Sequence, residues 1–476
     1  MRALLLPVQE SLGVSQRLAV LLVLASLGGL VLGVSIAIRS GLLLEFTGVA
    51  FVLLVFALSL RWPLLALFAF VALIPIEEVI RFGEIGTPSR IAGLLFAVAY
   101  GIPRLGRLTL RAMPPVAWAY VAFAVLSLGW ALDPDATGDA LQTMIQLFAV
   151  AVLVADVVVH RPTIVRPLLW VYSLSAALTA LIGVQALLTG GIASGERIAA
   201  FQDQDVAQFA AILLPALVFS LFELLKGRLI LLSGAVALVC TAGVVLSGTR
   251  GAWLSLVVVA VLFILPRFRR RQQVAAVVVA LLLLAVTLQL PGTDELVAER
   301  ADVAISSGGS GRTDIWSVGM GIFGSAPVAG VGFANFPIAF TSEQVRAAAV
   351  TSEIGTGRGP HSIIIGALGE LGLIGFTLLA LFVLPLVMRR GWGPEAPAVQ
   401  AALASLMTAA LFLDVISNRK QVWLVLGLAA GLAYLRGQHE VPVALPRTGD
   451  VQPSVQPALA RPMLGTSPQP PSRALP

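Results

Sequence analysis

His361 is the residue of this sequence best placed for proton chemistry. It lies in the segment Arg358-Gly359-Pro360-His361-Ser362, directly before a long apolar run. An imidazole at the edge of such a run can change charge near neutral pH and act as a general acid or base. The competing interpretation is a histidine that only caps the helix that follows it. The residues alone leave both interpretations open.

Two arginines stand at the edges of other apolar runs. Arg250 lies in Ser247-Gly248-Thr249-Arg250-Gly251, a connection so short that its guanidinium must sit near membrane depth. Ionisable groups there are costly and tend to mark functional paths. The alternative is that Arg250 reaches outward to the lipid headgroups. Arg197 precedes a later apolar run, and a solvated surface position is the simpler interpretation for it.

Arg312 belongs to a long segment, 291–361, that holds no long apolar run. Its motif includes Gly311, Arg312 and Trp316, and glycines, prolines and Asn335 follow it. Loops longer than about 15 residues are usually functional or disordered. Apolar residues recur at helical spacing over Thr313–Phe323, which predicts a short amphipathic helix lying on the membrane surface.

Glu370 is the main ionisable residue inside a predicted span. It follows His361 by nine positions, so a continuous helix would place it about 13 Å deeper at 1.5 Å per residue. A carboxylate inside a span usually has a partner or serves a proton path. The separation argues against direct cooperation between Glu370 and His361.

Several kinds of chemistry are not expected. Cys240 is the only cysteine, which rules out an intrachain disulfide and a cysteine-based metal site, and a chain with three histidines is a poor candidate for a histidine-rich zinc site. Gly330-Val331-Gly332 resembles part of a dinucleotide fingerprint, but no strand precedes it and no third glycine follows at the required spacing. We therefore predict no metal and no cofactor.

Composition identifies the elements that must position these side chains. Of 476 residues, 58% are hydrophobic and 12% are charged, whereas a soluble domain carries about a quarter charged residues. The positive charges are scattered between apolar runs instead of clustering on one soluble face, which excludes a nucleic-acid-binding protein. The sequence predicts an all-α integral membrane protein with about 12–14 transmembrane helices, since runs of roughly 18 apolar residues can cross a bilayer.

The apolar runs give fourteen candidate spans. The first follows a basic N-terminus but has no small-residue cleavage site, so it is interpreted as a retained helix. The short fourth and tenth candidates are the weakest. The candidates are 18–38, 42–60, 63–80, 91–103, 115–132, 141–160, 167–189, 206–225, 229–248, 251–266, 274–290, 362–388, 396–414 and 421–436.

Arginine and lysine positions predict the orientation, because basic loops are retained in the cytoplasm. Cytoplasmic N- and C-termini place the long loop outside. This divides the chain into N-terminal helices (1–190), central helices with arginine-bearing outer loops (191–290), the extracytoplasmic loop (291–361), C-terminal helices (362–436) and a disordered cytoplasmic tail (437–476). The predicted inside set is Arg2, Arg17, Arg61, Arg104, Arg107, Arg111, Arg161, Arg166, Lys226, Arg228, Arg267, Arg269, Arg270, Arg271, Arg389 and Arg390.

Taken together, these motifs resemble the O-antigen ligase and O-antigen polymerase superfamily over about 190–390. The resemblance lies in the order and spacing of short motifs that share the predicted outer face. They are Arg197 with Phe201 and Gln202 to Pro215, Ser247 to Trp253, Gly311, Arg312 and Trp316, Gly330, Gly332, Asn335 and Phe336, and then His361, Ser362, Gly372 and Gly375.

The resemblance implies a bacterial membrane glycosyltransferase. Its donor would be a glycan on undecaprenyl diphosphate, and its acceptor a glycan, lipid or protein outside the cytoplasmic membrane, with neither metal nor nucleotide required. Arg250 and Arg312, with Arg197 as a weaker match, would bind the diphosphate through forked, charge-assisted hydrogen bonds. His361 would match the family's essential histidine and accept the acceptor's proton, which gives inversion at the anomeric carbon.

Departures from the family pattern leave alternatives open. Ser362 stands where many members carry asparagine, and Phe376 follows Gly375 where ligases usually have a small or polar residue. Fourteen spans also exceed the twelve usual for ligases, so ligase and polymerase are not separated. A transporter or flippase of lipid-linked glycans would need polar groups at broken helices in the membrane centre. A non-catalytic scaffold is opposed only by the resemblance.

Overall fold

The computed structural model describes seven stretches of the chain and two single residues. They are 58–59, 61–77, 87–189, 205–287, 312–348, 355–413 and 419–440, with residues 199 and 289. Five predicted features lie wholly or partly outside them: the span 18–38, the span 42–60 apart from 58–59, Arg197 with the part of its motif before residue 205, Gly308–Gly311, and the tail beyond 440.

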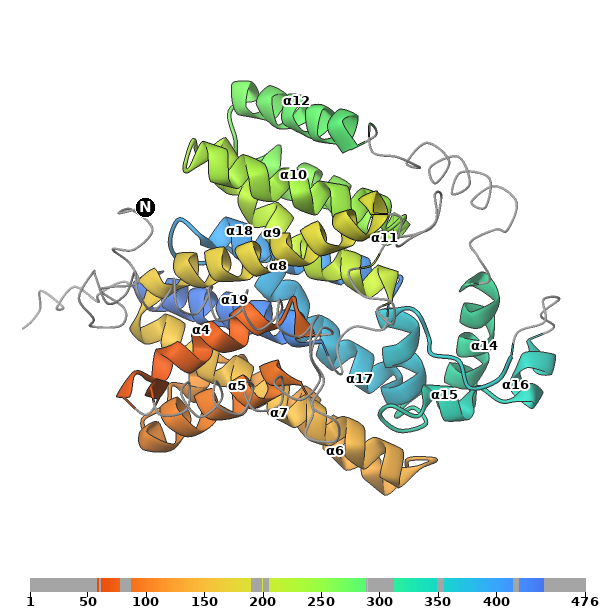
Figure 1. The fold of residues 1–476 in the computed structure, drawn as a ribbon. Helices are drawn as coiled ribbons and strands as arrows, with labels where there is room; N and C mark the ends of the chain where they lie inside the picture. The colour runs from red at the N-terminus through yellow and green to blue at the C-terminus, as the bar shows by residue number, and fades with distance from the viewer. Residues whose placement is uncertain are drawn as a thin grey trace, which may run out of the picture.

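Every regular element in the described stretches is helical (Figure 1). Each of the twelve predicted spans from 63–80 onward coincides with a helix or with a helix and its short extension. The elements are α4 (Pro63–Leu73), α5 (Pro88–Phe96), η3 (Ala97–Gly101), η4 (Ile102–Arg104), η5 (Leu110–Ala112), α6 (Pro115–Leu126), η6 (Ser127–Gly129), α7 (Pro134–His160), η7 (Pro162–Ile164), α8 (Val165–Leu188), α9 (Val206–Leu225), α10 (Ile230–Leu246), α11 (Arg250–Val259), η8 (Ala260–Ile264), α12 (Arg270–Thr287), α14 (Arg312–Ser325), α15 (Phe336–Ala339), α16 (Ser342–Ala347), α17 (Ile363–Met388), α18 (Ala396–Ala410) and α19 (Lys420–Glu440).

Length and composition identify an all-α membrane protein. Within the described ranges, four helices are long and apolar enough to cross a bilayer: Pro134–His160, Pro162–Leu187, Val206–Leu225 and Ile363–Met388. Further apolar helices of 10–17 residues pack beside them. Proline at the first position starts α4, α5, α6 and α7, where its missing N–H leaves no helical hydrogen bond unmade.

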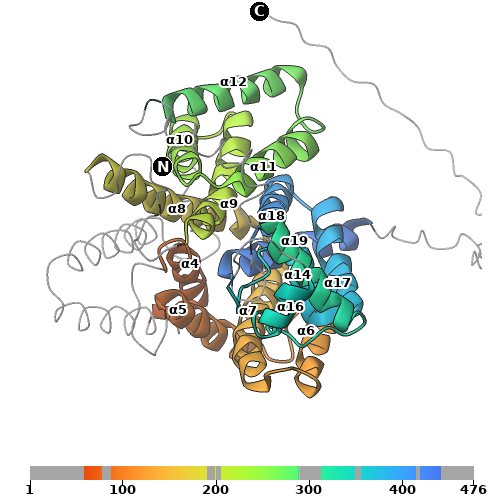
Figure 2. The ribbon, with the colours of Figure 1, turned by 90° about the vertical axis from the view of Figure 1, so that its right-hand side faces the viewer.

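The bundle has two ends of different character. At the first, here called the basic end, the buried carboxylate of Glu223 accepts from Arg166 at 2.6 Å, and Arg228 lies 3.4 Å from Glu395. At the second, the loop end, α14, α15 and α16 sit beside the start of α17 (Figures 1 and 2). Those arginines and lysines of the predicted cytoplasmic set that the structure describes therefore lie at the basic end. Arg312 lies at the loop end.

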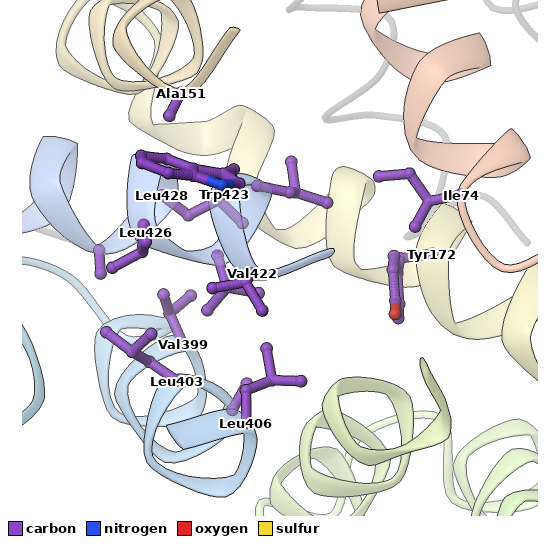
Figure 3. Packing of buried hydrophobic residues seen from close by; sticks show 14 of the residues in the cluster. Ile74, Ala151, Tyr172, Val399, Leu403, Leu406, Val422, Trp423, Leu426 and Leu428 are labelled. Carbon is purple, nitrogen blue, oxygen red and sulfur yellow. The ribbon is translucent and has the colours of Figure 1, made fainter. Parts of the chain in front are cut away.

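The C-terminal helix α19 lies in the centre of the bundle, alongside α7. Gly427 and Gly431 let the two backbones approach so closely that a Cβ on Gly427 would stand 2.6 Å from the Ala151 carbonyl oxygen. Figure 3 shows Trp423 of α19 next to Ala151, where its ring meets Phe148 edge-on at 5.9 Å. Small residues at this spacing are typical of close helix pairs in membranes.

The predicted continuous helix over 362–388 is wrong at one residue. Gly372 has φ 61° and ψ −163°, which breaks α17 into two helical pieces. The segment 327–332 runs beside the break and exchanges backbone hydrogen bonds with it. Val331 and Gly332 N–H groups donate to the carbonyls of Gly369 and Glu370 at 3.0 and 2.9 Å. In return, Leu373 and Ile374 N–H groups donate to the carbonyls of Pro327 and Val328 at 2.9 and 3.2 Å.

Glycine is required where the two segments meet. Gly330 has φ +70°, and a Cβ there would lie 2.3 Å from the Glu370 carbonyl carbon. A Cβ on Gly372 would lie 2.4 Å from the Val328 carbonyl carbon. Both distances are shorter than any side chain tolerates. Gly330, which belongs to the segment that resembles a nucleotide fingerprint, therefore serves close backbone packing against α17.

Asn335 fastens the same loop to the turn before α7. Its side chain is fully buried. The Asn335 Oδ1 accepts from the Asp133 N–H at 2.6 Å, and its Nδ2 donates to Thr137 Oγ1 at 2.5 Å and to the Phe333 carbonyl at 2.9 Å. The loop is thus held by α17 on one side and by α7 on the other.

The helix predicted over Thr313–Phe323 is present as α14, but its apolar face does not rest on a membrane surface. Ile315, Val318 and Ile322 pack with Phe336 and Phe340 in a small core of the loop end. A Cβ on Gly319 would stand 2.4 Å from Ile365 of α17. The apolar spacing therefore serves contacts within the protein.

We predict that Gly330→Ala destabilises the protein by about 3 kcal/mol or more, because it combines a left-handed backbone with a clash against Glu370. Gly393→Ala is the matched control: Gly393 has φ +87° but nothing within 4 Å of its Cβ position, so only the backbone cost of about 1–2 kcal/mol applies. Thermal unfolding in detergent measures both variants. Equal losses would contradict the proposed close contact.

Candidate active site

Arg250 is positioned by a tight turn at the loop end. Gly248 has φ +60°, and the Thr249 N–H donates to Ser247 Oγ at 3.2 Å. Thr249 Oγ1 in turn donates to the Val206 carbonyl at 3.4 Å. The turn is thereby tied to the start of α9, and Arg250 becomes the first residue of α11.

Phe412 brings Arg250 and Arg312 to the same place. A Cβ on Gly251, next to Arg250, would stand 3.0 Å from the Phe412 ring. From the other side, the Arg312 guanidinium lies 6.0 Å from the centre of that ring, and the Trp316 ring lies 6.3 Å from it. The N-termini of α11 and α14, far apart in sequence, therefore meet at the end of α18.

The two arginines share a partly buried, positively charged site. Desolvation lowers the pKa of Arg312, the charge of Arg250 lowers it further, and the carboxylate of Asp205 partly offsets both effects. Each arginine also begins a helix, where the macrodipole disfavours a cation and favours an anion. This combination is suited to a multiply charged anion such as a diphosphate.

The first turn of α9 contacts Arg419, a residue that the sequence interpretation missed. Asp205 caps the helix by accepting from the N–H groups of Ala207 and Gln208 at 2.8 and 2.9 Å. Gln208 Oε1 then accepts from Arg419 Nη1 at 2.6 Å. A third guanidinium thus borders the turn that also touches Thr249. The sequence offered one indication of Arg419, which is that a cation stands directly before the last apolar run.

Lys420 beside it is engaged in holding helices together. Its ammonium forms an ion pair with Glu77 and donates to Thr87 Oγ1 at 2.9 Å. Arg419 and Lys420 are therefore adjacent in sequence but differ in role.

His361 lies at the start of α17 on the same end of the molecule. The N-cap of α17 is Ser362, so the alternative in which His361 caps the helix is wrong. His361 has φ 47°, an uncommon backbone conformation outside glycine that is enriched at functional sites. Its imidazole is half-buried and forms no hydrogen bond or ion pair with the described residues.

Glu370 lies two residues before Gly372 in α17. It lies at the break of α17, where its carbonyl accepts from Gly332, and its charge interacts with buried Tyr120 of α6. Among the described residues, no three histidine, cysteine, aspartate or glutamate side chains form a group able to hold a metal ion.

Comparison with known families decides the assignment. Residues 234–380 match the family model described as O-antigen ligase. This part of the chain is similar to the O-antigen ligase family. A search of curated proteins finds no match to the chain.

The matched residues contain Arg250, Arg312, His361 and the broken part of α17. Arg197 and Arg419 lie outside the match. At the level that the match supports, the protein is a membrane glycosyltransferase.

We predict that Arg312→Gln leaves the unliganded protein as stable as wild type or more stable, because it removes a desolvated charge next to Arg250. Arg166→Gln is the matched control at the basic end. It leaves the buried Glu223 carboxylate without its 2.6 Å partner and should cost about 3 kcal/mol. Thermal unfolding in detergent without lipid-linked glycan compares the two. A large loss for Arg312→Gln would indicate a structural role instead.

Proposed function

We propose that the protein transfers a glycan from an undecaprenyl diphosphate carrier to an acceptor at the outer face of a bacterial cytoplasmic membrane. The meeting of Arg250 and Arg312 on Phe412 is the observation that carries the proposal. Without a metal, guanidinium groups must supply the stabilisation of charge that develops on a diphosphate leaving group.

The reaction is a direct displacement. The acceptor hydroxyl attacks the anomeric carbon, the bond from that carbon to the diphosphate oxygen breaks, and the new glycosidic bond forms with inversion. His361 accepts the hydroxyl proton, while Arg250 and Arg312 bind the departing diphosphate. Arg419, through its position beside Gln208, extends the positive surface of the site, and Arg197 remains a proposed ligand on the strength of the resemblance.

The positive-inside rule supports the orientation. Arg161, Arg166 and Arg389 belong to the basic end, which we assign to the cytoplasm. The loop end with Arg312 then faces outward, and the C-terminus follows α19 to the cytoplasmic side, as do residues 1–17 in the predicted topology.

A flippase is the second candidate, and the break in α17 is the feature that would favour it, because transporters bind substrates at broken helices. Here the freed carbonyls and N–H groups around Gly372 are engaged by residues 327–332. The described buried carboxylates Asp156 and Glu223 pair near the basic end. Both observations favour a transfer reaction at one membrane surface over transport of a lipid-linked glycan through the membrane.

Transfer in reconstituted liposomes tests the function. Undecaprenyl diphosphate glycan and candidate acceptors are supplied with a chelator and without nucleotide sugar. We expect product from wild type and a loss of about 100-fold or more for Arg312→Ala, because one donor to a developing anion is removed. Product length separates a ligase from a polymerase. Absence of product together with movement of the lipid-linked glycan between leaflets would support the flippase.

His361→Ala should lower the turnover rate by about 100- to 10,000-fold, because a general base is removed, while binding of the donor is kept. Arg358→Ala, three residues away and exposed, is the control and should retain turnover. Single-turnover rates and donor binding are measured separately. Retained turnover in His361→Ala would disprove its role as base.

A further inference from the structure

We propose that the basic end carries a binding site for the phosphate of an anionic phospholipid, formed by Arg104, Arg107 and His160. A cavity of about 370 Å³ is lined by these three side chains and Pro103. It lies at the opposite end of the bundle from Arg312. The proposal is independent of the transfer reaction.

One buried carboxylate holds the segment that carries three of the four lining residues, Pro103, Arg104 and Arg107. Asp156 of α7 is fully buried. It accepts from Tyr100 Oη at 2.8 Å and from the Thr109 N–H at 2.7 Å. The chain between Tyr100 and Thr109 is thereby pinned to α7 at both of its ends, and the arginines between them are presented from a fixed turn.

Two of the lining side chains are held by Tyr100 and by Asp156. The Arg104 guanidinium lies over the Tyr100 ring at 4.1 Å. His160 Nδ1 lies 2.9 Å from the Asp156 carbonyl oxygen, which directs the other ring nitrogen away from α7. The Asp156 carboxylate faces Tyr100 and Thr109 and also lies 3.4 Å from His160 Nδ1, so the guanidinium groups of Arg104 and Arg107 supply the positive charge of the cavity. Forked guanidinium groups with an adjacent imidazole are suited to phosphate oxygens.

Apolar neighbours favour a lipid over a soluble phosphate. Ile102, Leu105 and Leu110 flank the arginines and are 58%, 71% and 48% exposed. Exposed apolar side chains next to cations match the boundary between headgroups and acyl chains. Basic pockets on the cytoplasmic side of membrane helices bind anionic headgroups, and the orientation proposed above places this cavity in that leaflet.

Native mass spectrometry of the full chain tests the site, with phosphatidylglycerol or phosphatidylcholine added to the detergent-purified protein. We expect wild type to retain phosphatidylglycerol in preference to phosphatidylcholine. The double variant Arg104→Gln with Arg107→Gln should reduce that preference on the order of tenfold, since each cation near the surface contributes about 1 kcal/mol. The control variant Arg389→Gln with Arg390→Gln removes the same charge from exposed positions on the basic end. It should keep the wild-type preference for phosphatidylglycerol.

Three results would overturn the proposal. They are equal retention of the two lipids by wild type, equal loss in both double variants, and displacement of phosphatidylglycerol by millimolar inorganic phosphate, which would assign the cavity to a soluble anion. The wild-type lipid comparison needs no variant and stands even if a double variant fails to fold. Transfer activity is not the readout, so failure here leaves the glycosyltransferase proposal untouched.

Discussion

The arrangement of the loop end depends on the backbone exchange between residues 327–332 and the break in α17. A straight α17 would satisfy its own carbonyls and N–H groups, and residues 327–332 would have no backbone groups of α17 to pair with. The turn at Gly372 frees them, and the loop engages four. A buried backbone group without a partner costs about 1–3 kcal/mol, and in a membrane water cannot replace the partner. Each segment therefore holds the conformation of the other.

This exchange places the chemistry-bearing side chains on one frame. His361 directly precedes the N-cap of α17, eleven positions before Gly372. The helix α14, which begins with Arg312, packs on α17 through Gly319 and Ile365. Asn335 joins the frame to α7. Arg250 arrives independently, from the turn tied to α9, and meets Arg312 at Phe412. The site is thus assembled from two rigid parts that touch at one aromatic ring.

Much of the fold follows from the sequence because apolar runs and proline starts are local signals. They predict α4 through α12 and α17 through α19, and helical spacing predicts α14. The break at Gly372 was not predicted, since a glycine inside an apolar run is also compatible with a straight helix. The packing of α14 was misread as membrane contact, because an apolar face does not say what covers it. Phe412 and Arg419 were missed, since they approach the arginines and Gln208 only in three dimensions.

The central position of α19 has a consequence for how the protein is made. Gly427 and Gly431 rest on the backbone of α7, about 280 positions earlier in the chain. Since translation runs from the N-terminus, α7 enters the membrane long before its closest neighbour exists. Until α19 arrives, the small-residue face of α7 lies open to lipid or to whatever insertion factor holds it. A chain truncated before Lys420 would keep its loop-end motifs but lose the helix that joins α7 to α18.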